Sequence, residues 1–375
     1  MHTDEIAELV KRTAHDAGFE LSGVAQLRDH PELAHFPEWI DAGRAGEMKY
    51  LESRDESGQL KRASLANTFP WARSVVVCAI NYNTSPPYSI EEREPNQGWI
   101  SRYAWSKEDY HDAVLRRLRQ VEGALKAASP GLITRSYVDT GPIVERVYAK
   151  YAGVGWIGKN TCILNQQLGS WLFLGVILTS LELQPDLPAA DRCGTCTRCI
   201  DACPTNAFIG PYELDATRCI SYLTIEKRGN LPEDLREGMG RHVFGCDICQ
   251  DVCPWNRKSP MAIAPEFQPR EGLVNPALEW LANMSEDEFR EKFRGSAIKR
   301  AKRTGLRRNA VIAMGNSGNR EFVTALTNLK TDEDEVVAQS AEWALTKLQK
   351  LNVNGETGVS SVIPGGDARR SIEQS

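Results

Sequence analysis

The chain has 375 residues, enough for two or three domains, and its hydrophobic (41%) and charged (25%) fractions are ordinary for a soluble globular protein. No apolar run approaches the ~20 residues of a transmembrane helix, and the polar first residues lack the apolar core of a signal peptide. We therefore expect a cytoplasmic protein without a membrane anchor, whose net charge of −5 argues against nonspecific adhesion to nucleic acid over the whole surface.

Hydrophobic periodicity predicts alternating helices and strands in the first half of the chain. Apolar side chains within 3–17 recur at helical spacing before a stop at Gly18, and the continuous apolar run 74–80 predicts a buried strand. Cys78 in that run is expected to be a small core residue, and Cys162 an inert buried thiol. The same periodicity predicts strands at 19–27, 132–138 and 171–178, and helices at 107–128 and 143–151.

Asp139 directly follows one of these predicted strands, in the turn Asp139-Thr140-Gly141-Pro142. An acid at the carboxyl end of a strand is a common place for chemistry in open α/β sheets. The alternative is structural, with Asp139 capping a helix that starts at Pro142. The residues alone leave both interpretations open.

A glycine-rich segment, residues 153–160, imitates two nucleotide-binding motifs. The sequence GVGWIG from Gly153 matches G-x-G-x-x-G, and its continuation nearly matches a P-loop, although Asn160 stands where a P-loop needs Ser or Thr. Both motifs require a preceding strand, and the helix predicted at 143–151 stands there instead. We therefore predict no nucleotide site, but a loop whose backbone can approach a flat or bulky ligand closely.

Eight of the ten cysteines fall between residues 193 and 253. The first run reads C-x2-C-x2-C-x3-C-P, the pattern of bacterial iron–sulfur proteins, whose fourth cysteine ligates the other cluster in two-cluster ferredoxins. The second run lacks the leading cysteine of this pattern, and Cys219 is the one left to replace it. Crosswise pairing then predicts two [4Fe–4S] clusters, one held by Cys193, Cys196, Cys199 and Cys253 and the other by Cys203, Cys219, Cys246 and Cys249.

Zinc and disulfides are the alternatives for these cysteines. Two C-x2-C knuckles would suit tetrahedral zinc, but three cysteines at x2-x2 spacing followed by x3-C-P suit a single ion poorly. Disulfides would need an oxidising compartment, which the polar amino terminus argues against. Two iron–sulfur clusters are therefore the favoured interpretation.

The last third of the chain predicts short helices and a basic surface. Ser285 and Glu288 fit a capping box. Residues 292–308 carry eight basic side chains and no acid, inside an acidic protein. A charge run usually marks a solvated face, but here we favour a phosphate-binding surface. Helices are expected near 306–314, 320–329 and 335–350, a spacing typical of a HEAT-type array.

These features together resemble the epoxyqueuosine reductase family, the cobalamin-dependent iron–sulfur enzymes that finish queuosine in the anticodon loop of tRNA. The resemblance spans about residues 48–316. It rests on the cysteine region and on the stretches RYA from Arg102, VDTGPIVER from Val138, GVGWIGKNT from Gly153 and GLRRNA from Gly305. It implies reduction of the epoxide on the wobble base to an alkene with loss of water, by cobalamin that receives electrons from the clusters.

The resemblance also implies roles for single residues. Asp139 matches the family's proton donor, and a carboxylic acid beside an apolar corrin would stay protonated and could protonate the departing epoxide oxygen. No Asp-x-His-x-x-Gly motif is present and His242 lacks that context, so the cobalamin is expected base-off, without a protein histidine on cobalt. The positions that match corrin contacts are Arg62, Arg102, Asp139, Ile163, Leu174, Ser221, Cys246 and Asp247.

The implied partners are the tRNA anticodon stem-loop and an external low-potential electron donor. RNA loops are recognised through splayed bases and phosphates, and phosphate contacts are predicted at Lys299, Arg300, Lys302, Arg303, Arg307 and Arg308. The competing functions are a reductive dehalogenase-like corrinoid enzyme, which would not need basic terminal helices, and an iron–sulfur electron carrier, which would not need the long amino-terminal part. Nothing in the sequence suggests an obligate dimer, so a monomer is expected.

The expected fold class is a multidomain α+β protein. Its parts are predicted as an α/β cobalamin-binding domain (1–184), a ferredoxin-like double-cluster domain (185–260), a linker (261–284), HEAT-like tRNA-binding helices (285–350) and a disordered tail (351–375). The cobalamin assignment comes from the resemblance alone, whereas the two clusters follow from the cysteine spacing.

Overall fold

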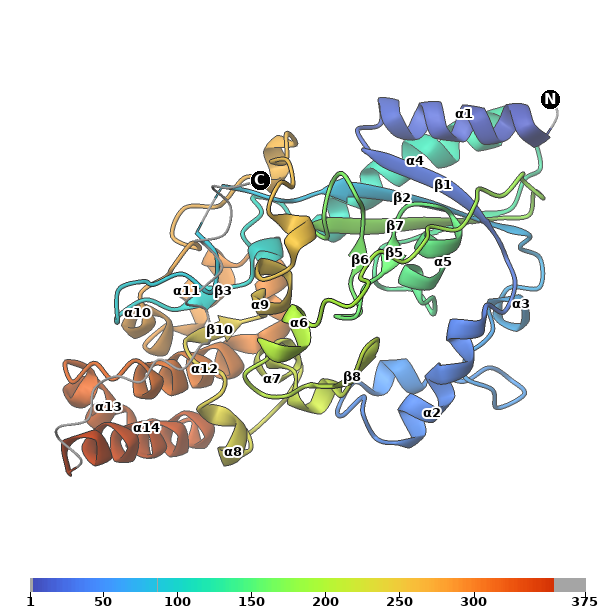
Figure 1. Cartoon of the computed structure of the whole chain (residues 1–375). Coiled ribbons are helices and arrows are strands. Elements are labelled where there is room, and N and C mark those ends of the chain that lie inside the picture. Colours follow the sequence, from blue (N-terminus) through green and yellow to red (C-terminus); the bar gives the residue numbers. More distant parts are fainter. Residues whose placement is uncertain (1–2, 86, 354–375) are drawn as a thin grey trace, which may run out of the picture.

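The computed structural model describes residues 3–85 and 87–353 (Figure 1). Its amino-terminal part is built on a four-stranded sheet with the order β1-β2-β7-β4, in which every neighbouring pair is antiparallel. The strands are β1 (Leu21–Gln26), β2 (Ser74–Asn81), β7 (Leu172–Thr179) and β4 (Thr134–Tyr137). All four lie where the apolar runs predicted strands.

Helices cover both faces of this sheet. α1 (Thr3–Asp16) and α4 (Tyr110–Ala128) pack together over one face, and α5 (Glu145–Tyr151) packs on the other (Figure 1). Alternate residues of β2 divide between these faces, so Cys78 joins the core under α1 and α4, whereas Val77 joins the core under α5. Cys78 is 0% exposed, which confirms it as a core residue.

The α/β assignment of this part is wrong. That class of sheet consists mainly of parallel strands joined by helical crossovers, whereas all pairs in this sheet are antiparallel. The part is therefore α+β, because alternation of helices and strands along a sequence does not reveal which strands pair or in which direction.

The glycine-rich segment forms a β-hairpin instead of a nucleotide-binding loop. α5 precedes it, and β5 (Trp156–Ile157) pairs with the antiparallel β6 (Ile163–Leu164). A Cβ on Gly155 would come within 2.4 Å of the Leu164 carbonyl oxygen, so the close approach of the two strands requires glycine there. The helix predicted before this segment is confirmed, and with it the reason for rejecting the strand–loop–helix motifs.

The cysteine region folds into short helices and turns between the sheet and the carboxyl-terminal helices (Figure 1). α6 (Arg198–Asp201) packs against α9 (Ile248–Asp251), which brings the two cysteine runs side by side. The other elements of this region are β8 (Phe208–Gly210), β9 (Glu213–Leu214), α7 (Ile220–Ile225), α8 (Glu233–Arg236) and β10 (His242–Phe244).

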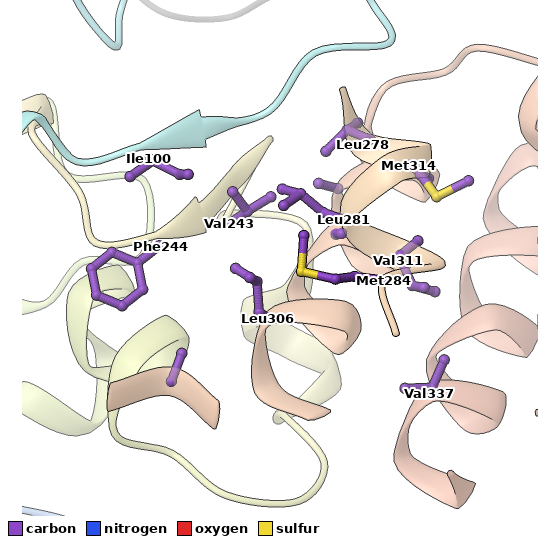
Figure 2. Close-up of a cluster of buried hydrophobic side chains, with 14 of the residues drawn as sticks. Ile100, Val243, Phe244, Leu278, Leu281, Met284, Leu306, Val311, Met314 and Val337 are labelled. Atoms are coloured by element: carbon purple, nitrogen blue, oxygen red, sulfur yellow. The ribbon is translucent and has the colours of Figure 1, made fainter. Parts of the chain in front are cut away.

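The carboxyl-terminal helices pack around a hydrophobic core that they share with β3 (Trp99–Ile100) and β10. Figure 2 shows this junction, where Ile100 and Phe244 lie with Leu306 and Leu281. The Ser285 capping box at the start of α11 is confirmed, while the HEAT-type array stays a prediction. The helices are α10 (Leu278–Ala282), α11 (Glu286–Lys292), α12 (Lys302–Asn316), α13 (Phe322–Leu329) and α14 (Glu335–Val353).

α12 lies in the middle of this helical part and packs against both α10 and α14. α14 runs to Val353, past the start of the tail predicted as disordered, and the rest of that tail, 354–375, lies outside the described residues. Within the described ranges, no helix combines the length and apolar character that a bilayer span requires.

Candidate active site

A cavity of about 1670 Å³ opens between the sheet and the cysteine region. It exceeds the roughly 300–1,000 Å³ of pockets that hold drug-sized ligands, so it has room for a larger molecule. Its walls come from the segment between β1 and β2, from the turn after β4, from the start of α4, from residues around Cys219 and from the 3-10 helix η7 (Ala297–Ala301). The segment between β1 and β2 also carries α2 (His35–Asp41) and α3 (Leu65–Thr68).

Asp139 lies at the cavity wall, in the turn that follows β4. Its Oδ2 accepts a hydrogen bond of 2.9 Å from the Tyr110 hydroxyl, at the start of α4. Its φ of 54° places the backbone in the left-handed region, which residues with a Cβ rarely adopt and which is over-represented at functional sites. The capping alternative is wrong, because α5 begins only at Glu145 and its N-cap, Val144, makes no side-chain hydrogen bond.

Arg62 joins this turn to another part of the wall. It is 7% exposed, and its guanidinium donates to the Tyr50 carbonyl oxygen at 2.9 Å and to the Gly141 carbonyl oxygen at 2.8 Å. Burial lowers the pKa of Arg62, while the charges of Glu145 and Asp139 act in the opposite direction. Arg62 therefore ties the segment between β1 and β2 to the Asp139 turn.

Glu145 is a second carboxyl group beside this turn, to which sequence analysis assigned no role. Its Oε1 is buried and has no hydrogen-bond partner within the part of the chain that the structure describes. Burial, and secondly the negative charge of Asp139, raise the pKa of Glu145 to about 7. Its place in the stretch VDTGPIVER was the available signal, but a glutamate at a helix start looks the same whether it is buried or exposed.

We expect Glu145→Gln to stabilise the protein increasingly as the pH rises from 5 to 8. The pKa in the folded state, about 7, exceeds the ordinary 4.5, so this group favours folding at low pH and loses that contribution as the pH rises through 7. The free energy of unfolding should fall by up to about 3 kcal/mol through this group. A glutamine cannot ionise, so the variant keeps this free energy. Anaerobic urea unfolding at each pH measures it, with the exposed Glu182→Gln as control; parallel pH slopes for wild type and Glu145→Gln would contradict the assignment.

The predicted corrin contacts divide between the cavity wall and the interior behind it. Arg62, Asp139 and Ser221 line the cavity. Two of the others, Ile163 and Leu174, belong to β6 and β7. The predicted contacts absent from the described wall are Arg102, Ile163, Leu174, Cys246 and Asp247.

Arg102 and Asp247 form a buried network behind the wall. Arg102 is 1% exposed, and its guanidinium lies 5.2 and 4.8 Å from the ring centroids of Trp105 and Trp171. Asp247 is 0% exposed and accepts hydrogen bonds from the Ser101 hydroxyl at 2.5 Å and the Arg102 backbone N–H at 2.7 Å. Buried charges need such partners, so both side chains have a structural task that sequence reasoning did not anticipate.

The eight cysteines of the double motif gather in two groups. Burial, and then neighbouring thiols of the same group, raise the pKa values of Cys199 and Cys246. Cys219 lines the cavity, so the second group lies beside the candidate active site. The first group is Cys193, Cys196, Cys199 and Cys253, and the second is Cys203, Cys219, Cys246 and Cys249.

The state of the thiols excludes one rejected alternative and corrects one expectation. All ten cysteines lie within the described residues and are free of disulfides, so the disulfide alternative is wrong. Cys162 is not an isolated core thiol, because a hydrogen bond with the Cys249 thiol lowers its pKa, against the effect of burial. Cys162 thus touches the second cysteine group, although it lies far from that group in sequence.

Two of the six predicted phosphate contacts, Arg307 and Arg308, are buried in α12. Arg307 is 4% exposed and donates to the Ala282 carbonyl oxygen at 2.7 Å and to the Asp332 carboxylate at 2.5 Å. Arg308 is 1% exposed and donates to the Leu223 carbonyl oxygen at 2.8 Å. These guanidinium groups hold the helices to one another and to the cysteine region, so their assignment to phosphate contacts is corrected to a structural role.

The remaining basic residues lie nearer the surface. Arg300 lines the cavity, where it donates to both carboxylate oxygens of Glu226, at 2.9 and 3.0 Å, and lies 5.1 Å from the centroid of the Tyr50 ring. Arg300 is the member of the basic run at the described cavity wall, where Glu226 balances its charge, and residues 299–303 around it are called the basic rim. Of the six predicted phosphate contacts, the exposed or half-buried ones are Lys299, Arg300, Lys302 and Arg303.

Comparison with known proteins assigns two segments to families. Residues 192–256 match the model of a 4Fe-4S double cluster binding domain, and residues 62–140 match the model of epoxyqueuosine reductase QueG, DUF1730. A curated relative, the epoxyqueuosine reductase of Synechocystis sp., is 41% identical over 293 residues, which cover 77% of this chain and 98% of that protein.

Solved structures have the same fold. A crystal structure of epoxyqueuosine reductase with an epoxyqueuosine-modified tRNA-Tyr stem loop is 30% identical, with a TM-score of 0.83 and 96% of each chain covered. The epoxyqueuosine reductase of Bacillus subtilis, in a structure with an aspartate catalytic loop swung out of the active site, is 29% identical, with a TM-score of 0.82 and 96% of each chain covered.

A double-cluster cysteine domain beside a large cavity with an acid at its wall defines an iron–sulfur oxidoreductase. The fold and the relatives narrow this class to one family. The chain belongs to the epoxyqueuosine reductase family. The expected α+β fold and double-cluster domain are confirmed.

Proposed function

We propose that this chain reduces the epoxide of epoxyqueuosine at the tRNA wobble position to the alkene of queuosine, in the cavity at Asp139. The net reaction takes up two electrons and two protons and releases water. One observation carries the proposal: Asp139 and Cys219 line the same cavity, so an acid and a cluster cysteine face one space. The relatives support the substrate, since one is named for this reaction and another holds an epoxyqueuosine-modified stem loop.

Two [4Fe–4S] clusters supply the electrons in this proposal, each held by one of the two cysteine groups. Iron–sulfur potentials reach about −700 mV, low enough to feed a strongly reducing centre. The second group contributes Cys219 to the cavity wall, so its cluster would pass electrons into the cavity. The first group would then receive them from an external low-potential donor.

Cobalamin is the cofactor that we propose for the cavity. The volume leaves room for a macrocycle, and the aromatic side chains Tyr50, Phe69 and Tyr103 at the wall suit a large flat ligand. Arg62 and Ser221 would hold it there, and the contacts behind the wall stay predictions. When bound, cobalamin would supply a strongly reducing cobalt centre.

A base-off cobalamin without a protein histidine stays part of the proposal. His242 is 6% exposed, its Nδ1 lies 3.0 Å from the Met239 carbonyl oxygen, and it is not among the residues at the described wall. His111 does line the cavity, with its Nδ1 2.8 Å from Asp109. His111→Gln therefore tests the proposal, and we expect an unchanged cobalt spectrum.

Asp139 would protonate the epoxide oxygen as the carbon–oxygen bond breaks. Without a proton this oxygen would leave as an alkoxide, and a positioned acid typically contributes 10²–10⁴-fold to such a step. We also propose that residues 138–142 correspond to the aspartate catalytic loop of the B. subtilis enzyme, which can swing out of the active site. The Arg62 contact to Gly141 supports this correspondence, because it holds a turn that has no helix of its own.

The decisive experiment is anaerobic conversion of epoxyqueuosine-containing tRNA by the reconstituted, cobalamin-loaded protein. We expect queuosine as the product, detected by mass spectrometry of the digested tRNA. An electron carrier would show reducible clusters but no product, and a dehalogenase-like enzyme would instead act on an organohalide. Absence of queuosine in protein with full iron and cobalt would overturn the proposal.

The tRNA would bind across the basic rim, through Lys299, Arg300, Lys302 and Arg303. We expect Lys299→Glu/Lys302→Glu to weaken stem-loop binding about tenfold or more and to reduce the salt slope by about 1.5, because each lost phosphate contact removes 0.7–0.9 from it. Fluorescence anisotropy at several salt concentrations measures both.

The matched control for this prediction is Arg12→Glu/Arg119→Glu, which makes the same charge change on exposed positions of α1 and α4. Equal losses in the two double variants would reveal an effect of net charge and contradict the proposed rim. Every residue in this proposal comes from one chain, so it needs no oligomer, and a cytoplasmic monomer remains our expectation.

A further inference from the structure

The Asp139 turn is held in the cavity by two side chains from other parts of the chain. The Tyr110 hydroxyl donates to Asp139 Oδ2 at 2.9 Å, and the Arg62 guanidinium donates to the Gly141 carbonyl oxygen at 2.8 Å. Between these two contacts Asp139 keeps its left-handed backbone, with a φ of 54°. A strained conformation of this kind persists only when its surroundings fix it.

Tyr110 is itself fixed in place. Its ring stacks on Phe173 of β7, with centroids 4.5 Å apart and planes 5° from parallel, and it also contacts the edge-on ring of Tyr103 and the tilted ring of His111. It begins α4, whose N-cap Asp109 accepts a hydrogen bond from the His111 backbone N–H. Burial raises the pKa of Tyr110 well above its ordinary value, so the hydroxyl keeps its proton and acts as the donor to Asp139.

Arg62 is also fixed by contacts outside the Asp139 turn. Its guanidinium bonds the Tyr50 carbonyl oxygen at 2.9 Å, and its carbon atom lies 5.9 Å from the centroid of the Tyr50 ring. One planar group thus bridges two backbone carbonyls that belong to different segments. A lysine could not do this, because its single ammonium is a point donor on a flexible stem.

We propose that Arg62 and Tyr110 form a latch that holds the Asp139 turn in the cavity and gives the two carboxyl oxygens different tasks. Oδ2 accepts the Tyr110 hydrogen bond, so the transferable proton resides on Oδ1, the oxygen left free for the substrate. Arg62 is then a positioning residue for the turn in addition to its place at the wall, and Tyr110 is a positioning residue for the acid. This inference deepens the proposed function and rests on the role of Asp139 in it.

The latch determines the fraction of molecules in which the Asp139 turn lies in the cavity. When one of its hydrogen bonds is removed, the strained turn relaxes and spends more time out of place. The rate of the chemical step falls in proportion to the fraction of molecules that hold the acid in position. Binding of the tRNA stem-loop, which uses the basic rim, should not change.

The test is Tyr110→Phe, which removes the hydroxyl and keeps the ring stacked. Hydrogen exchange of peptides covering residues 136–144 should become faster and kcat should fall, with unchanged KM for tRNA. The two fold-changes should multiply to about tenfold, the size expected for one hydrogen bond to a carboxyl group. Iron content, cobalamin binding and exchange of the sheet should match the wild type. Arg62→Lys should show the same faster exchange of the turn.

The control is Tyr151→Phe, which removes another tyrosine hydroxyl that bonds a carboxylate, that of Glu32 at 3.1 Å, away from the cavity wall. Exchange of residues 136–144 and kcat that stay at wild-type values in Tyr110→Phe would overturn the latch. The exchange measurement needs no turnover, so it distinguishes a failed latch from a failed function. If the wild type forms no queuosine, the function is wrong, and if Asp139→Asn turns over normally, the role of Asp139 is wrong, whatever the exchange shows.

Discussion

Asp139→Asn should lose at least about 10²-fold, and up to about 10⁴-fold, of the single-turnover rate on epoxyqueuosine-containing tRNA, the range that a positioned general acid contributes. Asparagine keeps the shape of the side chain and can still accept the Tyr110 hydrogen bond that Asp139 accepts at 2.9 Å. It cannot release a proton to the departing epoxide oxygen. The turn should therefore stay in place while the chemical step fails.

The control for this variant is Glu145→Gln, which removes the neighbouring carboxyl group. Glu145 is absent from the described cavity wall, so it should not reach the substrate, and its variant should retain most of the rate. Rapid-quench experiments with prereduced protein measure the chemical step separately from tRNA release. If Asp139→Asn kept its rate and Glu145→Gln lost it, the acid would have been assigned to the wrong carboxyl group.

Local signals in the sequence pointed to Asp139, and the structure places it at the cavity wall, while its role as the acid stays a prediction. A strand pattern ends at Val138, and the turn residues Gly141 and Pro142 follow at once. What holds Asp139 could not be predicted, since Tyr110 and Arg62 come from other segments and meet the turn only through the packing of α4 and the β1–β2 segment against the sheet. Long-range hydrogen bonds of this kind leave no pattern of spacing.

The basic run shows the opposite case, a clear pattern with a mixed outcome. Lys299 and Lys302 are exposed, as a solvated or phosphate-binding face requires. A few residues later Arg307 and Arg308 point into the protein, because Asp332 and backbone carbonyls, such as that of Leu223, accept their hydrogen bonds. Charge in a sequence predicts exposure only on average, and an arginine with a full set of acceptors can be buried.

The sheet illustrates a third limit. The runs that became β2 and β7 were recognisable as strands, because both are continuous and apolar. Their antiparallel pairing depends on the long connection between them, which includes loops and α4. The alternation of helices and strands along the sequence was instead typical of a parallel sheet. Element types were therefore predictable, whereas strand direction was not.

The second large effect concerns the assignment of the cysteines to the two clusters. One double cysteine variant should keep one cluster, whereas another should lose both. In the crosswise arrangement Cys203 and Cys219 belong to the same cluster, so Cys203→Ala/Cys219→Ala should retain about four irons per chain. Cys199→Ala/Cys203→Ala removes one ligand from each cluster and should retain almost none. Both should abolish turnover, since the cluster nearest the cavity is lost in each.

Pairing in sequence order would reverse the two outcomes, because Cys199 and Cys203 would then share a cluster and Cys203 and Cys219 would not. The proximity of Cys246 to Cys219 and Cys203, which together with burial raises its pKa, favours the crosswise arrangement. Iron analysis and electron paramagnetic resonance of the dithionite-reduced proteins measure the remaining cluster, with the core variant Cys78→Ala, expected to hold about eight irons, as control. Four irons in the Cys199/Cys203 variant and none in the Cys203/Cys219 variant would establish the sequential pairing instead.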